Sequence, residues 1–367
     1  GLFTQVEQLN KTALKAHGLD KNGHLYKVNS FDFHRYEDTI KLADDPDYNQ
    51  ANFEGMLEIK GDSDHTKLIE MLEALNDDSQ KIDDVLDTYF DTENLVYWMA
   101  FQILTGNCDT QNRNCYLYSP LNSNTWYILD WDNDGMLRKL ELSLKGFSDY
   151  ASWERGVSNY WGNVLFNRAL RSKSFRSELD RAVKDLRTYL TEARLAKMIK
   201  HYREVTESLV FAAPDIDNLP VTKDEYEQIA AAIPSEIEEN YKSFRESYKK
   251  PMPFYIGVPQ IDNGKLRMNW DASYDFKARD IRYTVELARD YAISDVLFKA
   301  EDVLLPEVTC DAPDAGQYFV RVRATNSDGY TQDAFDYYVT DDGKHYGMKC
   351  FYVQDGGKVV EDTYEEG

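Results

Sequence analysis

The apolar residues between positions 65 and 104 recur at the spacing of helices. Leucine, methionine, isoleucine and valine at helical intervals predict one helix over residues 65–76 and a second from residue 82 to residue 89. Residues 95–104 are apolar almost all round, which predicts a helix that is buried on most of its faces. These stripes are most simply explained as the core of a helical domain.

Short strands are expected on both sides of these helices. Residues 2–7 and 25–28 alternate enough for two strands near the start of the chain. Residues 115–118 and 126–129 predict a strand pair joined by a turn-rich connector. The polar stretch before this pair and the acidic stretch after it therefore lie at the ends of apolar segments, where side chains can be held rigidly and still reach water.

Beyond residue 140 the pattern changes twice. Residues 140–161 are expected to form a linker, whose Tyr150, Trp153, Tyr160 and Trp161 could line a groove or could pin a long loop to the body. Helices follow, and Thr222-x-x-Glu225 and Ser235-x-x-Glu238 are two capping-box patterns. Because Pro234 stands between them, we expect it to separate two helices.

After residue 253 the chain contains strand patterns with polar turns between them. They fall at residues 266–270, 283–287, 296–299 and 318–326, which is typical of a small β-sandwich. Residues 348–353 and 358–360 around Asp355 predict a further hairpin, followed by an acidic end.

Composition narrows the classes of function. A chain of 367 residues is expected to contain two domains. The net charge of −23 and the lack of a basic cluster argue against nucleic-acid binding, and they fit divalent cations or basic partners. No apolar run approaches the ~20 residues of a membrane span. No signal peptide is visible, and a chain that begins at Gly1 without Met is expected to have been trimmed.

Four cysteines leave two alternatives open. Cys108 with Cys115, and Cys310 with Cys350, could form two local disulfides in an exported protein, or all four could be buried thiols. Because there is no Cys-x-x-Cys motif, a zinc site is not expected.

Candidate chemistry lies at residues 106–135. Asp109 and Asn114 have the Asp-x-x-x-x-Asn spacing by which protein kinases place a base and a magnesium ligand on one loop. A second acidic group follows at the end of the expected hairpin. One Asp that accepts a hydroxyl proton, with an amide and a carboxylate that hold Mg²⁺, is the minimum that phosphoryl transfer needs.

These residues resemble the spore coat protein H (CotH) kinase family of atypical kinases. The resemblance rests on Asn107-x-Asp109, Asn114-x-Tyr116-Leu-Tyr and Trp131-Asp132-x-Asp134, and it extends to residues 1–8 (GLFTQVEQ), 23–27 (GHLYK) and 165–170 (LFNRAL) with Phe175. It covers roughly residues 1 to 250.

The resemblance implies a kinase-like fold and a set of roles. Asp109 is then the catalytic Asp, and Asn114 and Asp132 hold the metal; Asp134 and Asp130 are further candidate ligands beside them. The implied cofactors are ATP and Mg²⁺ or Mn²⁺, and a hinge to the nucleotide is expected near Glu7 and Gln8.

The chain departs from the family at two points. Asp130 stands where the family usually has an apolar residue or Pro, and its charge could add a metal ligand or raise metal affinity. The chain opens at Gly1, where the small lobe of the family is nearly over, so we expect either an excised fragment or an incomplete kinase.

The acidic stretch supports a competing interpretation. Asp130, Asp132, Asp134, Gly135 and Glu141 satisfy the Asp-x-Asp-x-Asp-Gly-x5-Glu calcium loop. An EF-hand needs a helix that enters this loop, whereas residues 125–129 are β-branched and aromatic and favour a strand. A structural Ca²⁺ at residues 130–141 stays an alternative.

The strand-rich part resembles a fibronectin type III domain. Trp270 corresponds to the buried strand-B tryptophan, Tyr318 to the tyrosine corner, and residues 326–329 to the final hairpin turn. The expected fold class is α+β. A mostly helical kinase-like large lobe with the remnant of a small β lobe (residues 1–250) precedes an all-β immunoglobulin- or fibronectin-like sandwich (251–341) and a hairpin with an acidic tail (342–367).

The sequence therefore supports two candidate functions. The first is a divalent-metal-dependent phosphotransferase that moves the ATP γ-phosphate to a hydroxyl acceptor on a protein or small molecule. The second is a non-catalytic binding protein, secreted or at the cell surface, with a pseudokinase body, a structural Ca²⁺ and a sandwich that binds a protein or a glycan. A hydrolase is disfavoured, because Gly-x-Ser-x-Gly and His-Glu-x-x-His are both absent from the sequence.

Overall fold

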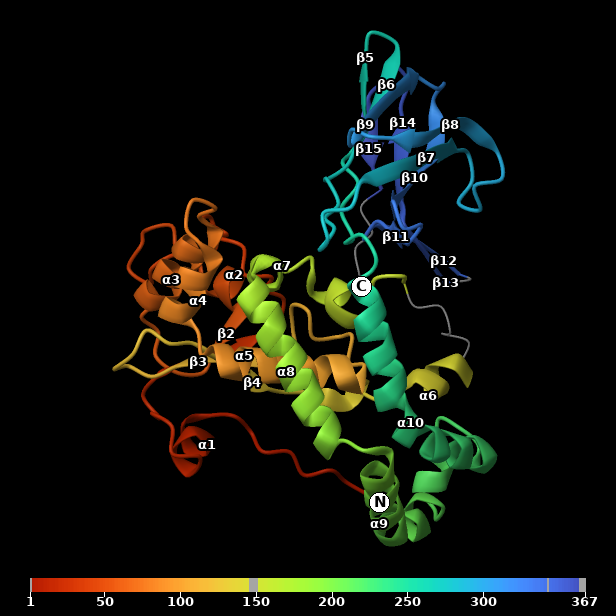
Figure 1. The fold of residues 1–367 in the computed structure, drawn as a ribbon. Helices are drawn as coiled ribbons and strands as arrows, with labels where there is room; N and C mark the ends of the chain where they lie inside the picture. Colours follow the sequence, from red (N-terminus) through yellow and green to blue (C-terminus); the bar gives the residue numbers. More distant parts are fainter. Residues whose placement is uncertain (1, 145–150, 342, 363–367) are drawn as a thin grey trace. The chain divides into compact units, whose positions relative to one another are not determined.

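The structure, a computed structural model, describes residues 2–144, 151–341 and 343–362. The chain forms two compact units, one of residues 1–149 and 162–244 and the other of residues 150–161 and 245–367. The first unit combines helices with a small sheet, and the second consists mainly of antiparallel sheets (Figure 1).

The helices of the first unit match the apolar stripes. The three predicted between residues 65 and 104 are confirmed as α3, α4 and α5. The helices are α1 Lys11–Ala16, α2 Gln50–Met56, α3 Thr66–Asn76, α4 Ile82–Tyr89, α5 Thr92–Thr105, α6 Lys139–Leu144, α7 Val164–Arg171, α8 Lys173–Tyr189, α9 Glu192–Val210 and α10 Lys223–Ser247. Two 3₁₀ turns, η1 Asn133–Gly135 and η3 Asp215–Asn218, also belong to this unit.

Helix α5 precedes the loop of residues 106–114, which we call the polar loop. Asp91 caps its first turn by accepting a hydrogen bond from the backbone N–H of Asn94 at 2.8 Å. Its side chains are buried on several faces, as predicted, and it packs against α8. Trp98 stacks on Phe166 of α7 with ring centroids 5.6 Å apart. Tertiary contacts on several sides thus fix the position of α5 and the direction in which the chain leaves it.

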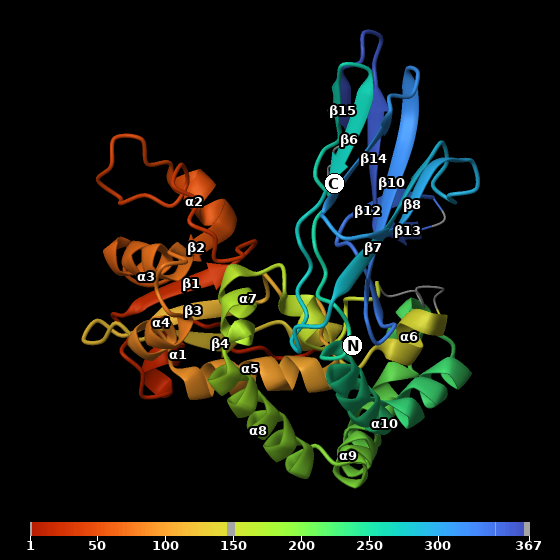
Figure 2. The same cartoon turned by 45° about the horizontal axis from the view of Figure 1, so that its top comes forward.

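One antiparallel sheet supports the candidate site. Its order is β2-β1-β3-β4, and its strands are β1 His24–Val28, β2 Leu57–Ile59, β3 Cys115–Ser119 and β4 Tyr127–Asp130. Figure 2 shows β1 and β3 side by side, and every residue of β3 is buried. The predicted hairpin is confirmed as β3 and β4, and its register pairs Cys115 with Asp130. The polar loop before β3 and the loop of residues 131–137 after β4, which we call the acidic loop, therefore lie at the same end of the sheet.

Two expectations for the first unit are wrong. Residues 2–7 form no strand; the N–H of Leu2 donates to Asp215 Oδ2 at 2.7 Å, and Phe3 is 89% exposed. Pro234 does not separate two helices but lies inside α10, and Ser235 donates through Oγ to the carbonyl of Ala232 instead of capping a new helix.

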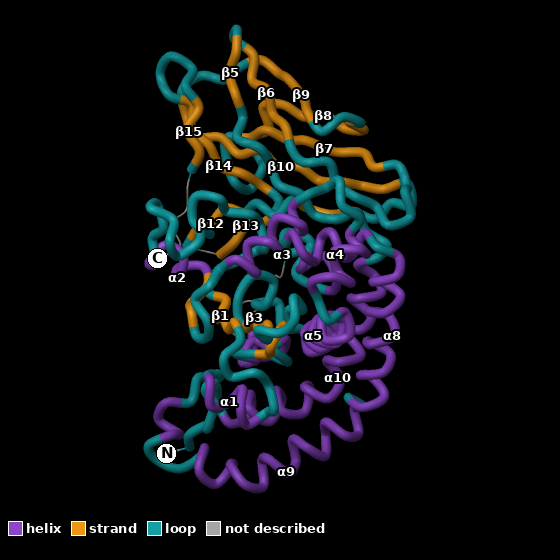
Figure 3. The backbone as a smooth tube through the Cα atoms, turned by 90° about the vertical axis from the view of Figure 1, so that its left-hand side faces the viewer, coloured by secondary structure: helices purple, strands orange, loops and turns teal. Residues whose placement is uncertain are grey.

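The second unit contains two sheets that share a large apolar cluster, and a separate two-stranded pair. A six-stranded sheet contains β15-β14-β10-β7-β8 with β11 paired to β10, and a three-stranded sheet has the order β5-β6-β9. Their strands are β5 Gln260–Asp262, β6 Lys265–Asn269, β7 Ile281–Ala288, β8 Val296–Val303, β9 Glu307–Asp311, β10 Gly316–Asn326, β11 Thr331–Asp333, β14 Met348–Val353 and β15 Val359–Glu361. β12 Tyr337–Thr340 and β13 Gly343–Tyr346 form a separate pair. Figure 3 shows these strands in orange, the colour of all strands in that view.

The core of this unit contains the two predicted aromatic residues. Trp270 and Tyr318 are 4% and 3% exposed, and the Tyr318 hydroxyl donates to the carbonyl of Asp314 at 2.9 Å. Residues 348–360 form the predicted hairpin, but β14 pairs with β10, so the hairpin is part of the six-stranded sheet and not a separate segment.

The described aromatic residues between 151 and 161 are buried and pin their segment, which is one of the two roles expected for them. Trp153, Tyr160 and Trp161 are buried, and the 3₁₀ helix η2 (Gly156–Tyr160) lies among them. Trp161 stacks on Tyr274 with ring centroids 5.3 Å apart. Tyr150 lies outside the described residues.

The structure also bears on the cysteines and on membrane insertion. All four cysteines lie in described segments and none forms a disulfide; Cys115 and Cys350 are buried. Across residues 2–144, 151–341 and 343–362, no helix combines the length and the apolar character that a membrane crossing needs.

Candidate functional site

The polar loop begins where α5 ends at Gly106. This residue adopts a left-handed conformation with φ 68° and ψ 24°, which L side chains rarely adopt. A Cβ built on it would lie 2.7 Å from Nδ2 of Asn240. Only glycine fits this position, so the chain turns sharply out of the buried helix and into the loop that carries Asp109.

Asp109 and Asn114 meet within one loop turn, as their spacing predicts for a kinase-like catalytic loop. Asn114 Nδ2 lies 3.0 Å from both the backbone carbonyl and Oδ2 of Asp109, and it donates to both. Asn114 itself has φ 58°, a left-handed value that asparagine tolerates better than most residues. Arg113 Nε lies 3.7 Å from Asp109 Oδ1. The carboxylate is thereby oriented by an amide and a guanidinium from its own loop.

Two elements anchor the same loop from outside. The N–H of Phe31 donates to the carbonyl of Asn112 at 2.8 Å, and Asn163 Nδ2 donates to the carbonyl of Gln111 at 2.8 Å. Asn163 is also the N-cap of α7, so one buried side chain links a helix start to this loop. Rigid neighbours on both sides favour a fixed position for Asp109.

The acidic loop lies directly against the polar loop. A Cβ built on Gly135 would lie 2.6 Å from Asn107 Oδ1 and 3.9 Å from Asp109 Cβ, so the two backbones approach closely. The N–H of Leu137 donates to the carbonyl of Thr105 at 2.8 Å. Asp132 has φ 57° and opens the turn η1. Two segments that are distant in sequence are therefore brought together around Asp109.

The electrostatic field at Asp109 reflects this convergence. Partial burial raises the pKa of its carboxyl, while Arg113 and the hydrogen bond from Asn114 act in the opposite direction, and the nearby negative charges of Asp134 and Asp132 raise it further. The side chain of Asp109 keeps 55% of its exposure, so it also reaches solvent. An accessible carboxylate with a raised pKa is a suitable proton acceptor.

Asp130 is held by amides. Its Oδ1 accepts from Gln102 Nε2 at 2.6 Å and its Oδ2 accepts from Asn133 Nδ2 at 2.6 Å. Gln102 is fully buried on α5, and its Nε2 also lies 3.4 Å from Asn133 Oδ1. Sequence reasoning missed Gln102, although it is the polar residue within the apolar stretch 95–104, which is a detectable signal.

The oxygen-rich residues fit a hard divalent cation in their chemistry. Carboxylate and amide oxygens are the ligands that Mg²⁺ prefers, and Asn107 Oδ1 is buried beside Gly135 without a hydrogen-bond partner among the described residues. However, those residues contain no group of three or more His, Cys, Asp or Glu side chains placed to hold a metal ion. Because Mg²⁺ commonly binds through one or two carboxylates and substrate phosphates, the donors fit a site that a nucleotide completes.

The calcium-loop interpretation lacks its entering helix. Strand β4 leads into Asp130, as the residue types predicted, and not a helix. Asp130 is bonded to two amides, and Glu141 forms an ion pair with Arg138 at 2.9 Å. These residues therefore do not form an EF-hand.

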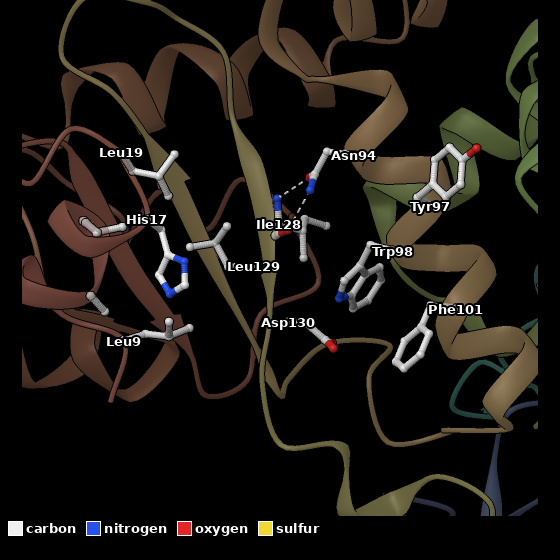
Figure 4. A pocket seen from close by; sticks show the side chains of 12 residues that line it. Leu9, His17, Leu19, Asn94, Tyr97, Trp98, Phe101, Ile128, Leu129 and Asp130 are labelled. Atoms are coloured by element: carbon white, nitrogen blue, oxygen red, sulfur yellow. Dashed lines mark hydrogen bonds between the residues drawn. The ribbon is translucent and has the colours of Figure 1, made fainter. Parts of the chain in front are cut away.

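A pocket of about 420 Å³ opens beside Asp130 (Figure 4). It lies between α1, α5 and the edge strand β4, and its lining is mostly apolar: Leu9, Ala13, Leu14, His17, Leu19, Asn94, Tyr97, Trp98, Phe101, Ile128, Leu129 and Asp130. The Asn94 side chain holds the free edge of β4 by accepting from the N–H of Ile128 at 2.8 Å and donating to its carbonyl at 3.1 Å. In Figure 4, Leu9, His17 and Leu19 lie on one side of the strand that carries Leu129, and Asn94, Trp98 and Phe101 lie on the other.

The expected hinge residues lie next to this pocket. Glu7 Oε2 is 2.8 Å from His17 Nε2, and Gln8 directly precedes the pocket residue Leu9. The segment that the family resemblance assigns to nucleotide contact therefore adjoins an apolar concavity with Asp130 at its edge.

Comparisons with known proteins identify the family of the chain. No curated protein matches the chain. Among solved structures, the twitchin kinase region from C. elegans (Fn31-NL-kin-CRD-Ig26) aligns at 19% identity over 26% of this chain and 20% of its own length, with a TM-score of 0.20. That similarity is too small to support the fold. The model of the CotH kinase protein family matches residues 1–244, and the chain therefore belongs to the CotH kinase family, whose members are atypical kinases.

Proposed function

We propose that the protein is a divalent-metal-dependent phosphotransferase that moves the γ-phosphate of ATP to a hydroxyl acceptor. One observation carries the proposal. Gly135 lies against Asn107 and Asp109, so the acidic loop adjoins a catalytic-type loop whose Asp109 and Asn114 are already hydrogen-bonded. The family match over residues 1–244 supports the same reaction class.

Asp109 is the proposed proton acceptor. Its pKa is raised by partial burial and by the neighbouring carboxylates, which makes it a better base towards a substrate hydroxyl than an ordinary Asp. Asn114 fixes one carboxylate oxygen, and Arg113 lies on the side of the other. The chain's contribution is chiefly positioning and charge, because phosphoryl transfer needs little covalent help from the protein.

Asn114, Asp132 and Asp134 are the proposed residues for Mg²⁺ or Mn²⁺. A bound divalent ion supplies neutralisation of the phosphate charge. The acidic residues that raise the pKa of Asp109 would then face a cation, which relieves their mutual repulsion. Asp130 is assigned to ordering of the acidic loop, because both of its oxygens accept amide hydrogen bonds.

The pocket beside Asp130 is the proposed position of the nucleoside. Its volume and apolar walls suit a flat ring. Asp130, which lines the pocket, comes two residues before Asp132 in the chain. The adjoining Glu7 and Gln8 are the residues at which the family resemblance expects the hinge. This assignment makes nucleotide affinity sensitive to the pocket walls and separable from the chemistry at Asp109.

The second unit is proposed to be a fibronectin type III-like module that spaces or binds. The buried Trp270 and the Tyr318 hydroxyl bonded to Asp314 support this assignment, as does the hairpin turn closed by the bond from the N–H of Gly329 to the carbonyl of Asn326. Such a module suits a secreted or cell-surface protein whose partner is a protein or a glycan.

One observation favours the second candidate, a non-catalytic binding protein. The described residues hold no ready-made cluster of three acidic or other metal ligands. A body that had lost catalysis would transfer no phosphate, and the protein would act through its binding surfaces alone.

A transfer assay with γ-labelled ATP separates these candidates. The full-length protein with Mg²⁺ or Mn²⁺ should label itself or a hydroxyl acceptor, and Asp109→Asn should reduce labelling by ~10²–10⁴-fold while nucleotide binding survives. Asp87→Asn, an exposed carboxylate on α4, is the matched control and should keep wild-type labelling. Equal labelling by the Asp109→Asn variant would reassign the base.

A further inference from the structure

Helix α10 carries two buried polar side chains one turn apart. Glu236 and Asn240 are 4% and 6% exposed, although Glu is rarely buried without a partner. They share a face with Ile237 and Phe244, which are 4% and 0% exposed. Figures 1 and 2 show α6 beside α10, and the contacts of Glu236 and Asn240 reach both loops of the candidate site.

Asn240 holds the end of α5. Its Nδ2 donates to the carbonyl of Leu104 at 3.0 Å, a group that has no partner within the helix at this end. The same side chain packs on Gly106, where a Cβ would be 2.7 Å from Nδ2. Asn240 therefore fixes the point from which the loop with Asp109 departs.

Glu236 holds the exit of the acidic loop. Its Oε2 accepts from the N–H of Lys139 at 3.3 Å, at the start of α6, and Lys139 Nζ also pairs with Glu239 on the same helix. Burial raises the pKa of the Glu236 carboxyl, and the backbone N–H groups of Lys139 and Leu140 act in the opposite direction. The Glu236 carboxylate thus contacts the backbone at the start of α6, where Lys139 lies four residues after Gly135.

These two contacts lie on either side of the site. Asn240 binds Leu104, two residues before Gly106, and Glu236 binds Lys139, two residues after Leu137. Between them, the N–H of Leu137 donates to the carbonyl of Thr105 and ties the two segments to each other. One helix face is therefore the common reference for both loops.

We propose that Glu236 and Asn240 are positioning residues that set the placement of Asp132 relative to Asp109. The inference rests on the proposed phosphotransferase function. Transfer requires the base and the metal ligands to keep one geometry, and displacement by ~1 Å can cost ~10²-fold in rate. Neither residue contacts the reacting atoms; each acts through the loop end that it binds.

The test compares variants in the full-length protein. Asn240→Leu and Glu236→Leu remove the two hydrogen bonds at similar volume, Glu236→Gln keeps an acceptor oxygen, and Glu238→Gln changes an exposed residue of the same helix that pairs with Arg187. We measure kcat for labelling from MgATP, the Kd for MgATP, and amide exchange in residues 106–114 and 131–137.

The expected pattern separates positioning from folding. Both Leu variants should lose ~10-fold or more in kcat, weaken MgATP binding ~10-fold and exchange faster in both loops, while Glu236→Gln restores most of kcat and Glu238→Gln matches wild type. An active wild type whose Leu variants lose only thermal stability, with kcat and Kd unchanged, overturns this inference alone. A wild type without labelling overturns the proposed function, and the inference falls with it. If the Leu variants fail to fold, Asn240→Asp, which lacks the donor at equal size, replaces them, and wild-type kcat in that variant overturns the inference.

Discussion

Asn114 donates through Nδ2 to Oδ2 of Asp109 at 3.0 Å, and the same nitrogen reaches the Asp109 carbonyl at 3.0 Å. An amide that binds both the side chain and the backbone of one residue fixes that residue's orientation as well as its position. Arg113 approaches the other carboxylate oxygen at 3.7 Å. The two groups that lower the pKa of Asp109, Arg113 and Asn114, therefore lie within five residues of it, so this part of its electrostatic environment can be changed without touching the acidic loop.

The pH dependence of transfer should respond to Arg113. The guanidinium lowers the pKa of Asp109, so Arg113→Gln should raise that pKa further. Asp109 acts as a base only when it is deprotonated, so activity is lost as the pH falls through its pKa, and the acid limb of kcat/KM should move to higher pH in the variant.

Arg113→Lys keeps the positive charge and serves as the control, with an acid limb near that of wild type. An unmoved acid limb in Arg113→Gln would mean that another group controls the profile.

Asp130 should prove structural. In the wild-type protein, Gln102 Nε2 donates to Asp130 Oδ1 at 2.6 Å. The Asp130→Asn variant replaces this carboxylate with a neutral amide. Weakening of this charged hydrogen bond, whose Gln102 end is buried and whose Asp130 end is exposed, should cost about 1 kcal/mol of stability. The affinity for Mn²⁺ with ATP should stay within ~2-fold of wild type, because both Asp130 oxygens are already engaged. Thermal melts and Mn²⁺ titrations measure the two effects, and a ~10-fold weaker metal affinity would make Asp130 a ligand.

Gly106 should tolerate no side chain. Gly106→Ala adds left-handed strain of about 1–2 kcal/mol and a methyl group that would lie 2.7 Å from Asn240 Nδ2. Gly18→Ala is the control, because Gly18 has φ 74° but nothing within 4 Å of an added Cβ. Urea unfolding should show a larger loss for Gly106→Ala than for Gly18→Ala. Equal losses would mean that the contact with Asn240 is not tight.

The pocket beside Asp130 should control nucleotide affinity. Leu19→Trp places a large ring at the lip of the pocket, where Leu19 is 37% exposed, and should weaken ATP binding ~10-fold or more. Leu42→Trp is the control, because Leu42 is 40% exposed and does not line this pocket. Isothermal titration with ATP and Mg²⁺ measures both variants. Unchanged affinity in Leu19→Trp would place the nucleoside elsewhere.

The sequence predicts the elements whose stability is local. The apolar periodicity of residues 65–104 yields α3, α4 and α5, and the hairpin that became β3 and β4 follows from its residue types. The spacing of Asp109 and Asn114 also predicts their proximity, because one loop turn carries both.

Tertiary contacts decide the elements that the sequence misplaces. Residues 2–7 have the alternation of a strand, but a strand needs a paired edge, and Leu2 bonds instead to Asp215. Pro234 costs a helix about 3 kcal/mol, yet α10 continues through it, because Ile237 and Phe244 in the part of the helix after it are buried.

The positioning contacts are the hardest to predict. Gln102 and Asn240 act on backbone or carboxyl groups far away in the chain, so no local spacing reveals their partners. A partial signal exists, because each is a polar residue with apolar neighbours at helical spacing: Asn240 lies three residues after Ile237 and four before Phe244.

The central claim is that the polar loop and the acidic loop share one cation-dependent nucleotide site. Titration of the full-length Asp132→Asn variant with ATP, in the presence and absence of Mg²⁺, tests it most directly. The account predicts that wild type binds ATP in a Mg²⁺-dependent manner and that Asp132→Asn loses this dependence while its melting temperature is kept. Mg²⁺-dependent binding that is equal in wild type and Asp132→Asn would contradict it.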